Sequence, residues 1–336
     1  MRLKRHWRSF VFVAAATVAF GCGQSGGDSS AATTGTSSKA AGGGSDTPVE
    51  VAFVTNNTSN YWATAHQGVD AAQSELKNVT VDFKSPPNGT MAEQKQILQD
   101  MITKGVQGIA ISPDDPPNAV QMLNDAASKA LVITQDSDAP GSKRTCYIGS
   151  DNVAAGKQVG EEIKKAIPSG GEAVFFVGDI GVDNAKQRFE GIKEALAGSN
   201  VTIGPVKTDQ ADHLRAKANA KDEIVKEPNV ACLVGLWSYN GPAILSAVKE
   251  LGKQGKIKIV CFDGDPDTID GVKDGIISAT VVQQPYQFGH DAVVDMVKYI
   301  RGDKSVFPAN GIIYIPTQVV DKSNVDAYKA KQPPAK

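Results

Sequence analysis

After Pro48 the chain alternates short runs of β-branched and apolar residues with longer amphipathic stretches, and this alternation restricts its fold more than any other feature. A short apolar run bounded by polar residues predicts a buried strand, and apolar residues three or four positions apart predict one face of a helix. Strands that alternate with helices form parallel sheets with helices on both faces. The sequence therefore predicts an α/β protein built from doubly wound parallel sheets.

The alternation falls into two sets of elements, so we expect two sheets. The first set predicts strands over residues 49–55, 79–83, 108–112 and 131–135, with helices over 62–76, 91–104 and 118–129. The second predicts strands over 172–177, 201–206, 231–236, 257–262 and 277–282, with helices over 183–197, 215–227, 241–251 and 266–274. A helix with Gly68-Val69 in the first set is echoed by one with Gly191-Ile192 in the second, which indicates internal pseudosymmetry. A final helix over 286–301 and a final strand over 312–319 could join either sheet.

The first 48 residues are predicted to direct the protein to its location and to take no part in the folded domain. Residues 1–21 have four basic residues, no acidic residue and an apolar run from Phe10 to Phe20, which is the layout of a secretory signal that is removed. Cys22 follows directly and resembles a lipoprotein processing site, so we expect a lipidated Cys22; ordinary cleavage nearby is the alternative. Residues 22–48 hold no Val, Ile, Leu, Met or aromatic residue and predict a disordered tether. The predicted location is the periplasm or cell envelope.

Several classes of protein are excluded by composition and by missing motifs. An apolar run of eleven residues is too short for a bilayer, which needs about 20, so the chain is not a channel or permease by itself. The net charge is −2, and −6 without the basic residues of the leader, so no basic surface for nucleic acid is expected. Cys146, Cys232 and Cys261 have irregular spacing and predict buried free thiols. There is no GxSxG, no P-loop and no GxGxxG after the first strand, so we expect no enzyme, cofactor or metal.

Polar and aromatic residues gather where the predicted strands end, and ligands of parallel sheets bind beyond these ends. The candidate binding residues are Tyr61, Trp62, Asp136, Ser137, Arg188, Trp237, Asn240, Asp263 and Gln283. Aromatic rings stack on the apolar C–H faces of a sugar, carboxylates accept its hydroxyl protons, and a guanidinium donates two hydrogen bonds. The residue types therefore predict a sugar or a similar polyol as the ligand.

Other roles are open for several of these residues. Tyr61 and Trp62 begin a helix and are equally consistent with the core. Arg188 lies on a helix, where an arginine is usually solvated. Asp263 and Asp265 precede a helix that either could cap. The prediction of a shared site rests on the convergence of the strand ends and not on any one residue.

From Val51 to about Val320 the chain resembles the type I periplasmic sugar-binding proteins, and among them the ribose-binding group. Four segments carry the resemblance: Asn60-Tyr-Trp62 with Gln67-Gly-Val-Asp-Ala-Ala72, Ile109-Ala-Ile-Ser-Pro113 with Val132-Ile-Thr-Gln-Asp136, Tyr147-Ile-Gly-Ser-Asp-Asn152 with Ala155-Gly156, and Val260-Cys-Phe-Asp-Gly264 with Val282-Gln-Gln-Pro285. The resemblance implies two lobes joined by a three-stranded hinge. It implies an N-terminal lobe of residues 49–150 and 284–311 and a C-terminal lobe of residues 151–283 and 312–330.

The resemblance also implies roles for individual residues. Tyr61 and Trp62 would stack on the sugar, and Asp136, Arg188 and Asp263 would bind its hydroxyls, with Gln283 at a hinge. Three residues depart from the ribose-binding pattern, because Ser137 replaces an arginine, and Ser112 and Trp237 each replace an asparagine. These changes favour a less densely hydrogen-bonded, larger sugar or polyol over ribose.

The predicted function is that of the solute-binding component of an ABC importer. Two closing lobes would capture a monosaccharide or related polyol and deliver it to a membrane permease with its ATPase. We expect a monomer that contacts the membrane only through its lipid anchor. Two alternatives remain open: a binding protein that reports to a membrane receptor, and a ligand such as a furanosyl signalling molecule.

Overall fold

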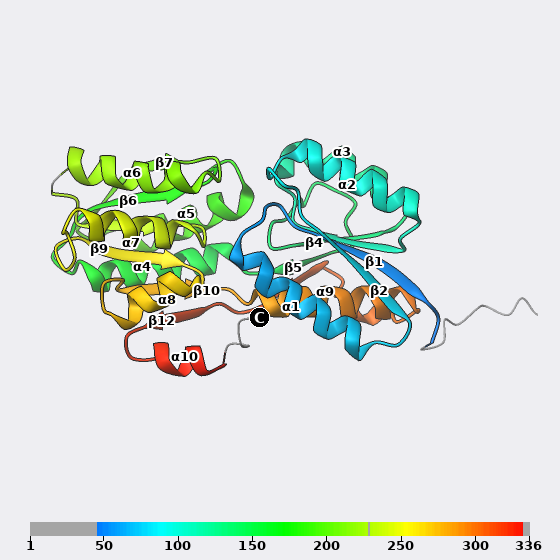
Figure 1. Ribbon diagram of the computed structural model, residues 1–336. Helices are drawn as coiled ribbons and strands as arrows, with labels where there is room; N and C mark the ends of the chain where they lie inside the picture. The colour runs from blue at the N-terminus through cyan, green and yellow to red at the C-terminus, as the bar shows by residue number, and fades with distance from the viewer. Residues whose placement is uncertain (1–45, 228, 332–336) are drawn as a thin grey trace, which may run out of the picture. The chain divides into compact units, whose positions relative to one another are not determined.

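Two six-stranded sheets, each covered by helices, make up the part of the chain that the computed structural model describes, residues 46–227 and 229–331 (Figure 1). These residues belong to one compact unit, Gly42–Lys336. The predicted leader and Cys22 lie outside the described residues, as does all of the predicted tether before residue 46. The prediction of an α/β protein with two parallel-sheet lobes is confirmed.

The first sheet has the strand order β11-β5-β4-β3-β1-β2, and all of its neighbours are parallel. Its strands are β1 Val49–Val54, β2 Val79–Lys84, β3 Gly108–Ile111, β4 Leu131–Gln135, β5 Cys146–Gly149 and β11 Ile312–Tyr314. Its helices are α1 Asn60–Glu75, α2 Met91–Lys104, α3 Pro116–Ala127 and α9 Pro285–Ile300, with a 3-10 turn, η1, at Lys304–Val306. Phe53 packs in the cluster that contains α1 and α9, whereas Val54 packs with α2 and α3. Alternate residues of β1 thus fill two different layers, as a strand buried on both faces requires.

The second sheet has the order β12-β10-β9-β8-β6-β7, and only the edge strand β12 is antiparallel. Its strands are β6 Gly171–Val177, β7 Val201–Thr208, β8 Cys232–Gly235, β9 Lys258–Phe262, β10 Ala279–Val282 and β12 Gln318–Asp321. Its helices are α4 Asn152–Ala166, α5 Asp183–Leu196, α6 His213–Lys226, α7 Asn240–Glu250, α8 Pro266–Lys273 and α10 Val325–Lys331. Neither α4 nor α10 was among the helices predicted from periodicity.

The helix α2 shows how local chemistry sets the ends of an element. Thr90 Oγ1 accepts a hydrogen bond from Glu93 N at 3.3 Å, and Glu93 Oε2 accepts one from Thr90 N at 3.4 Å, which forms a capping box. Gly105 ends the helix with φ 89°, a left-handed conformation that glycine adopts without strain. The helix therefore begins and ends where the sequence predicts.

The chain crosses between the sheets three times: between β5 and α4, between β10 and α9, and between β11 and β12. The prediction that all of residues 312–330 join the C-terminal lobe is wrong for Ile312–Tyr314. These residues pair in parallel with β5, from Ile312 opposite Tyr147 to Tyr314 opposite Gly149. The predicted final strand is two strands, because the chain leaves the first sheet near Pro316, which has no N–H to donate to a ladder.

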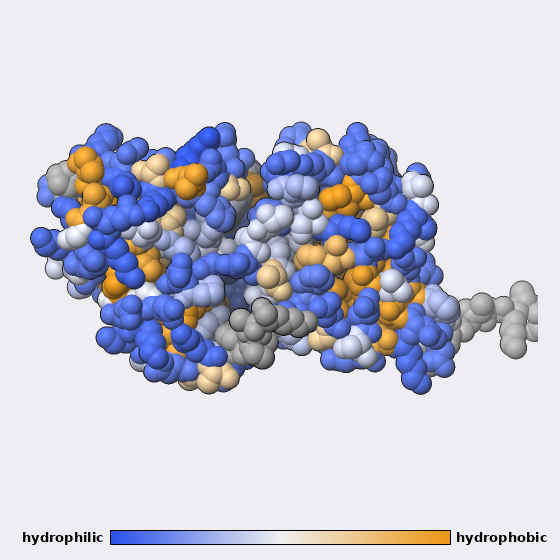
Figure 2. Space-filling model, in the orientation of Figure 1, coloured by the Kyte–Doolittle hydropathy of each residue, from blue (hydrophilic) through white to orange (hydrophobic). Residues whose placement is uncertain are grey.

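Most of the molecular face in Figure 2 is hydrophilic, with small separate apolar patches. No helix within the described residues is long and apolar enough to cross a bilayer.

Two pairs of helices pack closely at glycines, one pair in each lobe. A Cβ at Gly68 of α1 would lie 1.9 Å from Tyr286 O of α9, and a Cβ at Gly191 of α5 would lie 2.1 Å from Val153 O of α4. Figure 1 shows α1 and α9 running side by side. The sequence echo between Gly68-Val69 and Gly191-Ile192 therefore corresponds to equivalent helix contacts in the two lobes.

We expect Gly191→Ala to lower the free energy of unfolding by about 1–3 kcal/mol, because the added methyl group must push α5 away from α4. Gly141→Ala is the matched control, since a Cβ there would meet its nearest atom, Val120 Cγ2, at 3.7 Å. Urea unfolding followed by circular dichroism measures both variants. Equal stability of the two variants would contradict the close approach at Gly191.

Candidate functional site

Side chains from the strand ends of both lobes line one cavity. Its lining residues are Asn56, Asn57, Ser59, Tyr61, Trp62, Asp136, Asn184, Arg188, Trp237, Ser238, Tyr239, Asp263 and Gln283. Seven of the nine residues predicted to bind a ligand are among them. The convergence expected from the sequence is therefore present in the structure.

Two aspartates occupy equivalent positions in the two lobes. Asp136 follows β4 and Asp263 follows β9, and their backbones have φ 60° and φ 67°. These left-handed conformations are uncommon for residues other than glycine, and they recur at functional sites. Both aspartates are almost fully buried, at 5% and 4% exposed.

Neutral donors hold the Asp136 carboxylate. Tyr61 donates its hydroxyl to Asp136 Oδ1 at 3.1 Å, and Ser112 Oγ donates to Oδ2 at 2.8 Å. Burial raises the pKa of Asp136 above its ordinary value, while the Arg188 charge and these hydrogen bonds oppose that rise. The same burial raises the pKa of the Tyr61 hydroxyl, so Tyr61 remains a donor.

The Asp263 carboxylate is held by one residue at a crossing between the lobes. Gln283 Nε2 lies 3.1 Å from Asp263 Oδ1, and Gln283 N donates to the same oxygen at 3.3 Å. Burial raises the pKa of Asp263 and the Arg188 guanidinium opposes the rise. Both carboxylates are thus buried near a single guanidinium.

Arg188 lies on α5 and is only 1% exposed, so the solvated arginine considered from the sequence is wrong. Its Nε donates to Asn152 Oδ1 at 3.0 Å and its Nη1 donates to Leu236 O at 2.7 Å. The guanidinium carbon lies 4.4 Å from the centre of the Phe262 ring, a cation–π contact. Its Nη2 is buried and has no hydrogen-bond partner. A buried charged donor without a partner is costly, and this atom can donate a hydrogen bond to a further oxygen.

Aromatic residues form further parts of the wall. Trp62 both lines the cavity and packs in the core beneath it, with its Nε1 donating to Asn56 Oδ1 at 3.0 Å. Trp237 follows β8, and its Nε1 donates to Asn184 Oδ1 at 3.1 Å. The rings of Trp237 and Tyr239 meet edge to face with centroids 6.2 Å apart. Hydrogen bonds and ring packing therefore fix the indoles in place.

Two predicted residues are not on the cavity wall. Ser137 is fully buried and is not among the residues that line the cavity. Asn240 is also fully buried; its Oδ1 accepts from Trp237 N at 3.0 Å and its Nδ2 donates to Asp209 Oδ2 at 3.0 Å. The prediction that Ser137 and Asn240 face a ligand is therefore corrected, and Asn240 holds the loop that carries Trp237.

Six lining residues were absent from the prediction: Asn56, Asn57, Ser59, Asn184, Ser238 and Tyr239. A signal existed for some of them, because Asn56 and Asn57 lie two and three residues beyond β1, and Asn184 lies four residues before Arg188 on the same helix face. Asp265 is the N-cap of α8, as considered from the sequence, and it also accepts from Asn60 Nδ2 of the other lobe at 3.2 Å.

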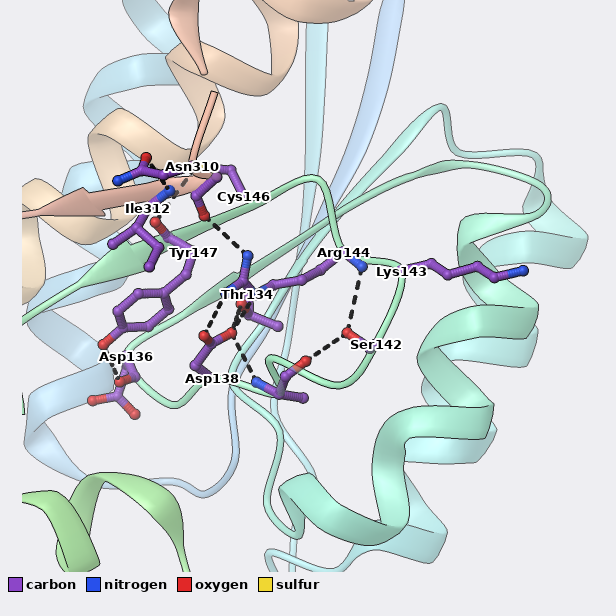
Figure 3. A network of polar contacts seen from close by, with 12 residues as sticks. Thr134, Asp136, Asp138, Ser142, Lys143, Arg144, Cys146, Tyr147, Asn310 and Ile312 are labelled. Carbon is purple, nitrogen blue, oxygen red and sulfur yellow. Dashed lines mark hydrogen bonds and ion pairs between the residues drawn. The ribbon is translucent and has the colours of Figure 1, made fainter. Parts of the chain in front are cut away.

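Asp138 and three cysteines near the strand ends have structural explanations, whereas Ser137 Oγ is buried without a hydrogen-bond partner. Asp138 forms an ion pair with Arg144, whose Nη1 donates to Gly311 O at 2.9 Å just before β11 (Figure 3). Cys146, Cys232 and Cys261 are buried free thiols, as predicted. Within residues 46–227 and 229–331 no group of three His, Cys, Asp or Glu side chains could hold a metal ion.

Two α/β lobes around a strand-end cavity with paired carboxylates, a buried arginine and aromatic walls define a two-lobed binding protein. A family model for the periplasmic binding protein domain matches residues 51–304, and the chain belongs to this family. Relatives and solved structures are consistent with that assignment. The ribose import binding protein RbsB of Salmonella typhimurium is 30% identical over 245 residues, covering 70% of this chain and 80% of RbsB.

The D-allose-binding periplasmic protein of Escherichia coli is 28% identical over 269 residues, covering 76% of this chain and 86% of that protein. The solved structure of an ABC transporter solute binding protein from Burkholderia graminis in complex with D-arabinose is 30% identical, with a TM-score of 0.79. That match covers 83% of this chain and 97% of the other chain. The resemblance to periplasmic sugar-binding proteins noted from the sequence is confirmed.

The carboxyl group of Asp114 lies beyond the end of β3 and outside the residues that line the cavity. Burial, together with the neighbouring carboxylates of Asp115 and Asp179, raises the pKa of Asp114 from 3.8 to about 6. Because this folded-state pKa is above the unfolded value, the stability that Asp114 contributes is fully present below 3.8 and is lost as the pH rises through about 6.

We expect Asp114→Asn to be more stable than the wild type at about pH 7.5, because the amide carries no charge to bury. The advantage should shrink steadily as the pH is lowered towards about 4, where the wild-type carboxyl is protonated. Urea unfolding across this pH range measures the difference. A constant difference at every pH would assign the effect to packing and contradict the raised pKa.

Proposed function

We propose that this chain is the solute-binding component of an ABC importer and that it captures a monosaccharide or a related polyol. The observation that carries the proposal is the buried Arg188 Nη2, which lacks a partner in a cavity that also holds two carboxylates. A sugar hydroxyl can accept from that nitrogen and donate to a carboxylate at the same time. A ligand rich in neighbouring hydroxyls therefore suits this set of groups.

Charge in the cavity favours a neutral ligand. Asp136 and Asp263 supply two carboxylates and Arg188 supplies one guanidinium, so an added phosphate or carboxylate would meet excess negative charge. Tyr61 and Trp237 add aromatic surface suited to the C–H faces of a sugar ring. Trp237 stands where the ribose-binding pattern has an asparagine, which favours a less densely hydrogen-bonded sugar than ribose.

The mechanism is capture followed by delivery, without chemical change to the ligand. Asp136 belongs to one lobe and Arg188 and Asp263 to the other, so one bound molecule contacts both lobes and stabilises their closed arrangement. The three crossings of the chain are the natural positions for a hinge. The closed form would then dock on a membrane permease. This role matches those of two relatives, the ribose import binding protein RbsB and the ABC transporter solute binding protein of Burkholderia graminis.

A thermal-shift screen of pentoses, hexoses, polyols and inositols tests the proposal. A sugar present at about 100 times its Kd should raise the Tm of the wild type by about 5–10 °C. Asp263→Ala should lose this shift, because the sugar loses a charged acceptor, while the protein without sugar still folds, as circular dichroism checks. Asp125→Ala on the exposed face of α3 is the control and should keep the full shift. An unchanged shift in Asp263→Ala would remove Asp263 from the binding site.

We further propose that the protein works in the periplasm and is anchored to the surface of a membrane through lipid on Cys22. The support comes from sequence, since the basic and apolar leader ends one residue before Cys22. Cells that express the full chain with labelled palmitate should label the wild type and Cys146→Ser, but not Cys22→Ser. An unlabelled wild type, with the protein free in the periplasmic fraction, would contradict the anchor.

A further inference from the structure

The two cavity aspartates share a backbone conformation that an L-residue rarely adopts. Asp136 has φ 60° and Asp263 has φ 67°, and each is the first residue beyond its strand. Such a conformation is strained for a side chain with a Cβ and persists only where the surroundings enforce it. The structure should therefore contain groups that hold both residues in place.

A buried hydroxyl bonds the carbonyl of each aspartate. Tyr147 donates its hydroxyl to Asp136 O at 2.9 Å, and Thr280 Oγ1 donates to Asp263 O at 2.7 Å. Figure 3 shows the Tyr147 ring reaching from β5 towards Asp136. Tyr147 is 4% exposed and Thr280 is fully buried, so water does not compete for either bond.

The two hydroxyls occupy the same topological position in their lobes. Tyr147 on β5 pairs with Thr134 on β4, and Thr280 on β10 pairs with Cys261 on β9. In each lobe, therefore, the hydroxyl residue lies on the strand that neighbours the aspartate's own strand. Its partner across the two strands is the residue two positions before the aspartate. The repetition of this arrangement in both lobes argues against a chance contact.

Polar contacts run between the two positions through Ser150 and Gln283, which lie at two crossings between the lobes. The Tyr147 hydroxyl also lies 3.1 Å from Ser150 O, at the end of β5. Ser150 Oγ donates to Gln283 Oε1 at 3.1 Å, and Gln283 Nε2 in turn lies 3.1 Å from Asp263 Oδ1. The groups that hold each carboxylate are thus tied to the segment where the chain passes between lobes.

We propose that Tyr147 and Thr280 are positioning residues for ligand binding, each fixing the left-handed backbone that presents a cavity carboxylate. Neither residue lines the cavity, so each acts through its aspartate and not by contact with the ligand. The inference rests on the proposed function for its binding test. It adds to that function two residues whose effect on affinity is indirect.

Calorimetric titration with a sugar identified in the thermal-shift screen tests the inference. Tyr147→Phe and Thr280→Val each remove one hydroxyl and keep the shape of the side chain. We expect each variant to weaken the affinity about tenfold. Thr280→Ser restores the hydroxyl and should bind as the wild type does. Tyr314→Phe, which removes an exposed hydroxyl from the neighbouring β11, should also leave the affinity unchanged.

A double-mutant cycle separates positioning from general stability. In an Asp136→Asn background, Tyr147→Phe should weaken binding by much less than tenfold, because the carboxylate that it positions is gone. A purely structural role would give the same loss in both backgrounds. An equal loss in the two backgrounds, or wild-type affinity in both hydroxyl variants, would overturn the inference.

Crystal structures of the unliganded variants give a readout that needs no sugar. In Tyr147→Phe we expect Asp136 to leave the left-handed region, and in Thr280→Val we expect the same of Asp263. Unchanged φ values in both variants would overturn the inference even if binding weakens. If the wild type binds no sugar in the screen, the proposed function fails, and the φ values alone decide whether the hydroxyls hold the aspartates.

Discussion

The burial of one guanidinium near two carboxylates is the interaction on which this site depends. Arg188 opposes the rise in pKa that burial imposes on Asp136 and on Asp263, so the three groups are stable in the interior only as a set. Removing the positive charge would leave two buried carboxylates without compensation, which is strongly destabilising. The Nη2 atom of the same guanidinium has no hydrogen-bond partner. The protein alone therefore satisfies most of the hydrogen-bonding groups of these three residues, and we propose that a ligand satisfies the rest.

The fold brings these groups together because both sheets end their strands at one cavity. Asp136 comes from the first sheet, and Arg188 and Asp263 come from elements of the second. A molecule that contacts all three groups must also contact both lobes, so binding and the arrangement of the lobes share one set of hydrogen bonds. Gln283 shows this link, because it lies where the chain crosses between the lobes and also donates a hydrogen bond to the carboxylate of Asp263.

Hydrophobic periodicity was sufficient to predict most of the fold, but not the pairing of strands whose partner is distant. The helix α4 was missed although Ala155, Val159 and Ile163 gather on one buried face, so the apolar pattern was present in the sequence and was not recognised. The final strand was predicted as one although Pro316 interrupts Ile312 to Val319. Which sheet each half joins depends on tertiary structure, because the chain crosses from the first sheet to the second between β11 and β12. For the site, the positions of the strand ends were sufficient to predict where the cavity lies. They were not sufficient to predict which side chains line it, because Ser137 and Asn240 follow strands and yet are buried away from the cavity.

A crystal structure of the protein with a bound sugar would show whether Arg188 binds the ligand. We expect a sugar oxygen within hydrogen-bond distance of Arg188 Nη2, and hydroxyl groups that donate to Asp136 and Asp263. A sugar bound elsewhere on the molecule, with Arg188 Nη2 still lacking a partner in an empty cavity, would contradict this expectation.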